Sequence, residues 1–553
     1  MRKTYQLCIN YFRQVNWNLL VFLLLVLNVK LVIKVLAILF ILITNYKSFT
    51  LINLRRQRLI FFYAAIIFIA CINYLLQIRQ ATVNYSLAAS FGLSLWIMAA
   101  VAGFFVFSII QKDTTERLHR TVELFFLLHI AAIGFNLLLI VIETGALNPY
   151  LYKGMNQKYY ISTGDFIRGI SFDSPVCTAM ISAFGLLYFL YRQQFAFSLL
   201  AMGSLLLIGS NLTNLFLLAI LVFAFLFKTS RIQKSFIALY IVLFIVFVAK
   251  VSPQNNEYME RFAYKMLGKT YDLPKKNTTP DFIRKQPDSL LSYDQKREKI
   301  ARLYIDSLSA TAAYLKNRST FLGKNNINAY YAVLRFSEAK PPSEPEIRFN
   351  NYRASEFTVE KIHRYHKFFA EHYHADSLQL TEKYDWSKPG KWVAGIQLVN
   401  FLRNNPAKMP LGAGIGNFSS RTAFKATGLD IAGGYPSRYR YISSLFLNNH
   451  LFLYIYYHAQ PQPKHAAENT PDSTYYQLLG EYGFVGLLAF LVLYFGYFIK
   501  KLPRSGYGIP LLLLLLMAFS VEYWFEQLSI VILAELLFFL AIADTSKKKE
   551  TIV

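Results

Sequence analysis

Long apolar runs separated by short polar connections fill residues 1–250 of this chain and return at residues 483–546. A helix needs about 17 to 25 apolar residues to cross a membrane, so runs of this length predict membrane spans. The pattern predicts an all-α polytopic membrane protein with about 12 transmembrane helices, or eleven if the short first two runs form one span. The expected spans are residues 17–29, 31–45, 59–77, 86–110, 122–144, 174–191, 194–210, 212–228, 234–250, 483–499, 508–522 and 527–543.

A long polar block separates the ninth expected span from the tenth. Two of its early stretches have apolar residues spaced near 3.6, which predicts a mostly helical insertion. Later come an amphipathic helix at residues 390–405 and an uncharged stretch at residues 441–458, which we interpret as an interfacial helix. Five regions are therefore expected: spans one to nine (1–250), the insertion (251–387), an outer loop with interfacial helices (388–482), spans ten to twelve (483–546) and a basic tail (547–553).

The positive charges of the short connections predict the orientation of the chain. Lys and Arg near span ends are retained in the cytoplasm, and an N-terminus inside places most of them there. The first residues lack a small-residue cleavage site, so we expect the first span to be retained. The result is a multi-pass membrane protein with both termini cytoplasmic and the polar block on the outer side. Much of the net charge of +26 is this topological signal, so nucleic acid is not an expected partner.

The C-terminal part of the polar block is strongly basic. Residues 388–463 carry eight Lys or Arg side chains against Asp430 alone, which predicts an anionic partner. No cysteine lies in the block, so we expect no disulfide and no Cys-based metal site there, and we assign no cofactor or metal. The eight basic residues are Lys388, Lys391, Arg403, Lys408, Arg421, Lys425, Arg438 and Arg440.

Gly412, Gly414 and Gly416 form a glycine loop in the same basic stretch. Glycines allow a backbone to approach a phosphate closely with its amides pointing at it. No βαβ unit surrounds them, which argues against a dinucleotide site, and a plain loop is the simpler interpretation. Four histidines also share a short window, where a solvated helix surface is a simpler interpretation than a metal site. They are His363, His366, His372 and His374.

Several charged residues lie close to span ends. Arg168 precedes the sixth span, where a cation can meet a lipid head group or pair with Asp165 or Asp173 of its own loop. Lys34 lies in a short apolar span and is expected to snorkel to the outer surface. Asp472 and Glu481 bracket the turn into the tenth span, where carboxylates more often stabilise a helix start than act as catalysts.

Four segments, in order along the chain, resemble the O-antigen ligase and polymerase family of membrane glycosyltransferases. The last two are the most specific, and residues 253–387 have no counterpart. The resemblance implies a GT-C-like bundle whose partners are an undecaprenyl-diphosphate-linked glycan donor, membrane lipids and, as acceptor, a lipid A core or a nascent glycan. The segments are IRGISFDSPVCTAM, LLLIGSNLTNLFLLAIL, KWVAGIQLVNFLRNNPAKMPLGAGIGNF and DSTYYQLLGEYGFVGLLAFL.

The resemblance also implies roles for individual residues. In the family's pattern, cations hold the donor diphosphate while an acceptor hydroxyl attacks the anomeric carbon from the opposite face, with inversion and without a metal. Arg168 matches an outer-loop arginine, and Lys391 matches a basic residue before the Pro-x-x-Gly-x-Gly segment. Glu481 and Gly483 match the turn into the tenth span. Further expected diphosphate ligands are Arg421, Arg438 and Arg440.

The chain departs from the family at two places. Ligases of the family usually have His-Asn where this chain has Asp472 and Ser473, and often Ser-Arg where it has Ser210 and Asn211. We expect Asp472 to orient or deprotonate the acceptor instead, provided that burial strengthens it as a base. His450 is the alternative catalyst. Ligation to a lipid A core and polymerisation of repeat units both stay open as functions.

Two other functional classes compete with glycan transfer. A polysaccharide transporter or flippase also has about twelve spans, but it places charged or broken-helix sites in related halves, whereas these spans divide nine and three. A non-catalytic membrane glycan-binding protein would use the insertion as its binding domain. Glycosyltransferases that use polyprenyl monophosphate sugars usually carry an acidic pair in the first large outer loop, and the first outer loops here contain none.

Overall fold

The computed structural model describes residues 11–45, 57–145, 147–148, 150, 167–227, 229–251, 364–365, 368, 388–429, 431, 434–458, 467–503 and 506–550. The chain forms two compact units, the first of Met1–Tyr152, Ile161–Met259 and Pro389–Val553, and the second of Lys153–Tyr160 and Glu260–Lys388. Nearly all of the predicted insertion, including its four histidines, lies outside the described residues, as do Cys8, Asp165 and Asp430.

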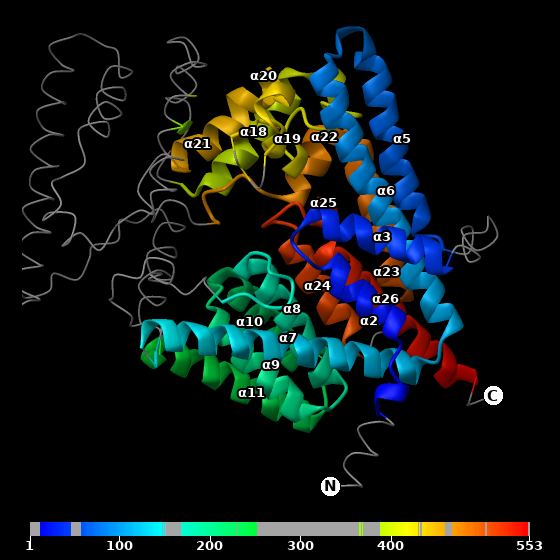
Figure 1. Cartoon of the computed structure of the whole chain (residues 1–553), viewed down its shortest axis with the longest axis vertical. Coiled ribbons are helices and arrows are strands. Elements are labelled where there is room, and N and C mark those ends of the chain that lie inside the picture. The colour runs from blue at the N-terminus through cyan, green and yellow to red at the C-terminus, as the bar shows by residue number, and fades with distance from the viewer. Residues whose placement is uncertain are drawn as a thin grey trace, which may run out of the picture. The chain divides into compact units, whose positions relative to one another are not determined.

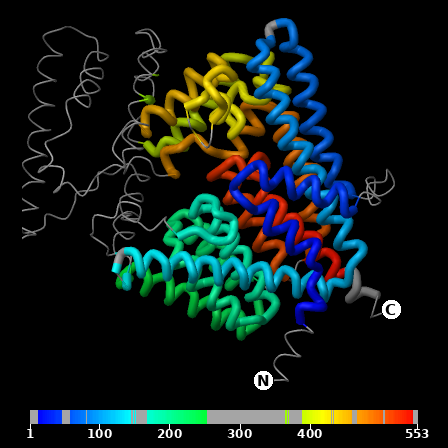
Figure 2. Tube along the Cα trace, in the orientation of Figure 1, coloured from blue at the N-terminus to red at the C-terminus, as the bar shows by residue number. Residues whose placement is uncertain are grey.

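The described part of the first unit is helical and contains no strand (Figures 1 and 2). Its N-terminal helices are α2 (Trp17–Val26), α3 (Leu31–Asn45), α5 (Ile60–Gln77), α6 (Val83–Lys112), α7 (Thr115–Thr144), α8 (Pro175–Tyr191), α9 (Phe195–Ile208), α10 (Asn211–Leu226) and α11 (Arg231–Val246). Its C-terminal helices are α18 (Gly390–Asn404), α19 (Arg421–Ala426), α20 (Ser444–Phe446), α21 (Phe452–His458), α22 (Thr474–Ala489), α23 (Gly496–Lys501), α24 (Gly508–Ala518), α25 (Trp524–Gln527) and α26 (Ser529–Glu550).

Among the described residues, five helical segments are long and apolar enough to cross a membrane, which confirms a helical membrane protein. They are Ile60–Gln77, Val83–Lys112, Thr115–Glu143, Arg231–Val251 and Thr474–Lys501. Six shorter apolar helices, of 10 to 17 residues, coincide with other expected spans. The total of twelve spans stays a prediction.

α26 lies at the centre of the bundle and packs on α6, α7, α8, α24 and α25. From Ser529 to Ala541 its side chains are buried, and α8 is buried along nearly all its length. Other helices expose one apolar face: in α3, Val32 is 71% and Ile43 is 75% exposed. Apolar side chains in such positions fit a lipid environment.

The helix of the tenth expected span begins at Thr474, well before the expected start at residue 483. Ser473 caps it, because its Oγ accepts a hydrogen bond from the Tyr475 amide at 3.2 Å. The first two turns contain Gln477 and Glu481, whose polarity hid this part of the helix from a hydropathy argument. At Gly483 the backbone breaks from helical geometry, with φ 68° and ψ −166°.

Residues of the polar block assemble at the ends of α5 and α6. α18 packs on α22 and α21, while α19 packs on α6. The predicted helix at residues 390–405 is observed as α18, ending at Asn404. The stretch at residues 441–458 forms α20, a π-helical turn (Leu447–Leu451) and α21 in place of one regular helix. In Figure 1, α18 to α22 gather beside α5 and α6.

Candidate active site

The N-terminus of α18 brings distant parts of the chain together at Lys391. Its Nζ donates hydrogen bonds to the carbonyl oxygen of Asp472 and, at 3.3 Å, to that of Val521. Gly390 lies so close to Asn469 that a Cβ would collide with the Asn469 backbone. Two of the three ammonium hydrogens of Lys391 are thus committed to backbone oxygens, so this residue first of all fixes the segment before α22.

Two carboxylates, Asp472 and Glu522, lie beside Lys391. Removal from water raises the pKa of Asp472, and the charge of Glu522 raises it further, while Lys391, a hydrogen bond with Thr470 and the charge of Arg421 act in the opposite direction. Burial likewise lowers the pKa of Lys391, against the effect of both carboxylates. A carboxyl group with a raised pKa can take up a proton near neutral pH, which a general base must do.

Tyr523, Ser419 and His450 form a buried chain of hydrogen bonds next to this pair. Nε2 of His450 lies 3.1 Å from the carbonyl oxygen of Ala394, which can only accept, so Nε2 carries the proton. Nδ1 therefore accepts, and its donor is the Ser419 hydroxyl at 2.6 Å. The Tyr523 hydroxyl then donates to Ser419 at 2.7 Å. The direction of each bond in the chain is fixed.

His450 is fully buried, and burial lowers its pKa to about 3 because the charged imidazolium is disfavoured. Both of its ring nitrogens already have partners. The geometry therefore indicates that His450 orients the hydroxyl groups of Ser419 and Tyr523. It does not favour His450 as the proton acceptor that the sequence offered as the alternative to Asp472.

A second group of charges surrounds Arg421 and Lys425, which lie one turn apart on α19. Burial and then the charge of Arg421 lower the pKa of Lys425, Glu526 and Asp173 act in the opposite direction, and the resulting pKa is about 8. Lys34 of α3 lies within electrostatic reach of both cations and of Asp173. Three cations from two distant parts of the chain therefore meet two carboxylates.

The buried position of Lys34 contradicts the expectation that its side chain snorkels to the outer surface. Its side chain is 4% exposed, and Nζ donates to the carbonyl oxygen of Val26 at 2.8 Å. The loop before α8 covers it, because the Val29 amide donates to the Ser171 carbonyl at 2.9 Å and so brings Asp173 near. A nearby carboxylate compensates a buried ammonium, which makes the inward position stable.

Glu526 of α25 holds the first turn of α19 and thereby positions Arg421. Its carboxylate accepts hydrogen bonds from the backbone amide of Thr422 at 2.8 Å and from the Thr422 hydroxyl at 3.1 Å. It accepts a third from the side-chain Nε2 of Gln477 at 2.8 Å. Burial raises the pKa of Glu526 to about 7 in spite of these bonds. Arg421 also acts on Asp472, so it connects the two groups of charges. We call them together the charged cluster: Lys34, Asp173, Lys391, Arg421, Lys425, Asp472, Glu522 and Glu526.

The amides of the glycine loop bond to protein groups. Gly412, Gly414 and Gly416 have φ of 80°, 87° and 75°, which favours glycine at each position. The Gly414 amide donates to the Glu481 carbonyl at 3.0 Å, and the amides of residues 418–419 donate to Glu481 Oε1 at 3.4 and 3.2 Å. The loop thus docks on α22 with a protein carboxylate in the position that a phosphate would take.

The break at Gly483 completes this docking. It frees two backbone amides of α22. The Phe484 amide donates to the Met409 carbonyl oxygen at 2.9 Å, and the Val485 amide donates to the Pro410 carbonyl oxygen at 3.0 Å. A Cβ on Gly483 would collide with the Pro410 carbonyl. The two segments that most resemble the glycosyltransferase family are therefore one packed unit in space.

Comparisons with known proteins do not assign this chain to a family. No family model, curated protein or solved structure matches this chain. In the part of the chain that the structure describes, no group of three or more His, Cys, Asp or Glu side chains is placed to hold a metal ion.

Three of the predicted diphosphate ligands make no hydrogen bond or ion pair with the charged cluster among the described residues. Arg168 is exposed, and among the described residues it makes no ion pair with Asp173. Arg438 lies over the Tyr439 ring, 4.5 Å from its centroid. Arg440 packs near Gly428, and its Nε is buried without a hydrogen-bond partner in the described structure. Of the predicted cations, the structure brings Lys391 and Arg421 to Asp472.

Several residues of the charged cluster are absent from the site predicted from the sequence. Glu522 and Glu526 lie four residues apart in VEYWFEQ, where the expected span 508–522 ends and before the last one begins, and this pair of acids in an apolar context was an available signal. Lys425 was recognised only as part of a basic stretch. Ser419, which bonds to His450 next to the cluster, had no distinguishing sequence context.

Proposed function

We propose that this chain is a membrane glycosyltransferase that moves a glycan from undecaprenyl diphosphate to an acceptor hydroxyl at the outer face of the bacterial inner membrane. The observation that carries the proposal is Asp472, a carboxyl group with a raised pKa beside Glu522 and within reach of Arg421. Such a transfer needs a base near a cation, because the acceptor loses a proton while the leaving group gains negative charge. Asp472 begins one of the two segments that most resemble the O-antigen ligase and polymerase family.

In the proposed step the acceptor oxygen forms a bond to the anomeric carbon while the bond from that carbon to the diphosphate oxygen breaks. The electron pair of the broken bond leaves with the diphosphate, and attack from the opposite face inverts the configuration. The acceptor proton passes to the ionised carboxylate of Asp472. The negative charge of Glu522 strengthens Asp472 as a base.

Arg421 and Lys425 are the proposed diphosphate ligands, with Lys34 as a third cation behind them. An arginine can bind phosphate oxygens through two parallel hydrogen bonds, which suits the extended charge of a diphosphate. Donors placed where negative charge develops are worth ~10²- to 10³-fold in rate each. Lys391 has a positioning role in the proposal, because its ammonium is bonded to the carbonyl oxygens of Asp472 and Val521.

Deletion of the gene, followed by mass spectrometry of surface glycans and lipid-linked intermediates, tests the proposed class of reaction. A lost ligase leaves unattached polymer on the lipid carrier, and a lost polymerase leaves single repeats. Either result supports glycan transfer and identifies the acceptor. Unchanged surface glycans and unchanged lipid-linked intermediates would contradict it.

Complementation of the deletion tests the site. Asp472→Asn and Arg421→Gln should fail to restore the glycan profile, since they remove the base and a diphosphate ligand while keeping side-chain size similar. Arg403→Gln is the matched control, because Arg403 is an exposed cation in the last turn of α18. Restoration by Asp472→Asn at wild-type level would remove Asp472 from the mechanism.

A further inference from the structure

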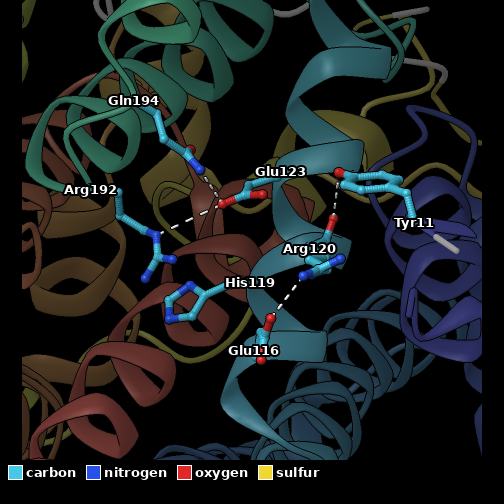
Figure 3. A pocket seen from close by; sticks show the side chains of 7 residues that line it. All are labelled: Tyr11, Glu116, His119, Arg120, Glu123, Arg192 and Gln194. Atoms are coloured by element: carbon cyan, nitrogen blue, oxygen red, sulfur yellow. Dashed lines mark hydrogen bonds and ion pairs between the residues drawn. The ribbon is translucent and has the colours of Figure 1, made fainter. Parts of the chain in front are cut away.

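A polar cavity lies far along α26 from the charged cluster. α26 starts directly after α25, which carries Glu526, and its Asp544 bonds to His119 of α7 at 2.9 Å. The helix between Ser529 and Asp544 is about 22 Å long. The cavity has a volume of 390 Å³ (Figure 3), and its lining includes Glu116, His119, Arg120, Glu123, Arg192 and Gln194. These residues belong to the start of α7 and the connection between α8 and α9, which positive charge predicts to be cytoplasmic.

The inner end of the cavity has more hydrogen-bond acceptors than donors. The carboxylate of Glu123, 12% exposed, accepts a hydrogen bond from Gln194 Nε2 at 2.6 Å. Arg192 Nε lies 3.8 Å from it, which is close enough for an ion pair but too far for a hydrogen bond. Gln194 Oε1 is buried and has no hydrogen-bond partner among the described residues. An ionised carboxylate has about four sites for donors, so the inner end has capacity for a cationic group.

Two guanidinium groups lie nearer the surface. The side chains of Arg120 and Arg192 are 29% and 33% exposed. One nitrogen of Arg120 bonds to Glu116 at 2.8 Å, and a guanidinium has five N–H donors in all. Figure 3 shows Arg120 and Arg192 on opposite sides of Glu123. Glu116, the partner of Arg120, is 77% exposed, so the cavity has negative charge inside and two positive charges against one negative charge toward its mouth.

We propose that this cavity binds a phosphoethanolamine group, with the ammonium at Glu123 and Gln194 Oε1 and the phosphate between Arg120 and Arg192. The order of the charges selects a zwitterion that enters with its ammonium first. In a phospholipid the ammonium is terminal and the phosphate is joined to glycerol, so the acyl chains leave through the mouth. Small-molecule pockets usually measure about 300 to 1,000 Å³, so the volume of 390 Å³ is sufficient.

Other ligands fit this order of charges less well. A purely anionic ligand would bring its negative charge against the carboxylate of Glu123, which is unfavourable at low exposure. Phosphatidylglycerol offers the phosphate but no ammonium. Free phosphoethanolamine offers the same groups as the lipid, so a test has to compare the two sources. The site is separate from the proposed glycan transfer and does not depend on it.

Native mass spectrometry of the full-length, delipidated protein in detergent tests the site. We expect phosphatidylethanolamine to be retained at least tenfold better than phosphatidylglycerol with the same acyl chains, and soluble phosphoethanolamine to compete. Glu123→Gln should abolish this preference, and Arg192→Gln should weaken binding of both lipids. Arg231→Gln is the matched control, since Arg231 is an exposed cation at the start of α11 and is absent from the cavity lining.

Each outcome of this experiment decides for or against the site. Binding of soluble phosphoethanolamine without the lipid, lost in Glu123→Gln, supports the recognition chemistry and makes a free zwitterion the ligand. Equal retention of both lipids by the wild type, or an unchanged preference in Glu123→Gln, overturns the proposal. Gln194→Leu provides a second test of the ammonium end should Glu123→Gln not fold, because it removes the unpartnered acceptor and should also reduce the preference.

Discussion

Among single residues, the neighbours of Asp472 decide its affinity for a proton. Burial and the charge of Glu522 raise its pKa more than Lys391 and Arg421 lower it. An unperturbed aspartate has a pKa of about 3.9 and is a weak base. The aspartate that stands where ligases of the resembled family usually have histidine therefore acquires, through burial, part of the basicity that a histidine has by nature.

The rate of glycan transfer should rise with pH through the raised pKa of Asp472. The carboxylate must be ionised to accept the acceptor proton, so transfer is slow below this pKa and fast above it. Glu522→Gln removes a negative charge that raises the pKa of Asp472, so the acid limb of the pH–rate profile should move to lower pH. The measurement is the initial rate of transfer by purified protein between pH 4 and 9.

Glu522→Asp is the control for this profile, because it keeps the charge and should leave the acid limb near its wild-type position. An acid limb that stays in place in Glu522→Gln would show that Glu522 does not tune the base. A rate that is independent of pH across this range would remove proton transfer to Asp472 from the limiting step.

Some of the site residues could be predicted from the sequence and others could not, and this difference has a physical cause. Asp472 and Lys391 lie in segments whose order along the chain resembles a family, so a motif could find them. Lys34 and Glu522 meet the site only through tertiary packing, α3 against the loop before α8 and the α24–α25 connection against α18. No local pattern of hydrophobic and polar residues encodes such contacts.

At the scale of elements, the helices followed closely from hydropathy, whereas the start of α22 did not. α5 and α8 begin within one residue of the expected spans at residues 59 and 174. α22 begins earlier than expected because its first two turns are amphipathic and pack on α18. The contact between α22 and the glycine loop, which needs the positive φ of Gly412 and Gly483, could not be derived from hydropathy.

Alanine at Gly412 or Gly483 should destabilise this contact strongly. Both residues have positive φ, and a Cβ on either would collide with backbone of the opposite segment. The left-handed conformation alone costs an L-residue about 1 to 2 kcal/mol, and the collision adds to it. We expect a lower thermal unfolding midpoint in detergent and less monodisperse protein in size-exclusion chromatography.

Gly134→Ala and Gly203→Ala are the matched controls. Both glycines lie inside helices, α7 and α9, and a Cβ would meet no atom within 4 Å. Alanine is favoured over glycine in a helix by roughly 0.5 to 1 kcal/mol, so these variants should be as stable as the wild type or slightly more stable. Equal stability of all four variants would contradict the packing described for the glycine loop.

For the whole molecule, apolar runs predicted a helical membrane protein, and the described helices confirm this class. Orientation depends on where positive charges lie relative to a membrane, and it remains a prediction. The charged cluster and the polar cavity lie near different ends of α26, so the prediction assigns them to opposite membrane faces.

Cysteine labelling in spheroplasts tests this orientation. Arg438→Cys, near the outer ends of α5 and α6, should react with a charged, impermeant maleimide, since Arg438 is exposed. Arg117→Cys, on the first turn of α7, should react only after permeabilisation, and its native side chain is 45% exposed. Cys177 is fully buried, and Cys8→Ser and Cys71→Ser remove the other background thiols. Labelling of both positions from outside would contradict the predicted topology.

The proposed role of Asp472 is tested most directly with purified protein and undecaprenyl-diphosphate glycan isolated from cells that lack the gene. Release of undecaprenyl diphosphate, in the presence of a membrane lipid extract as the source of acceptor, reports transfer for a ligase and a polymerase alike. Wild-type protein should release the carrier, and Asp472→Asn should do so ~10²- to 10⁴-fold more slowly, the usual contribution of a general base. Release by Asp472→Asn at the wild-type rate would contradict the proposed mechanism.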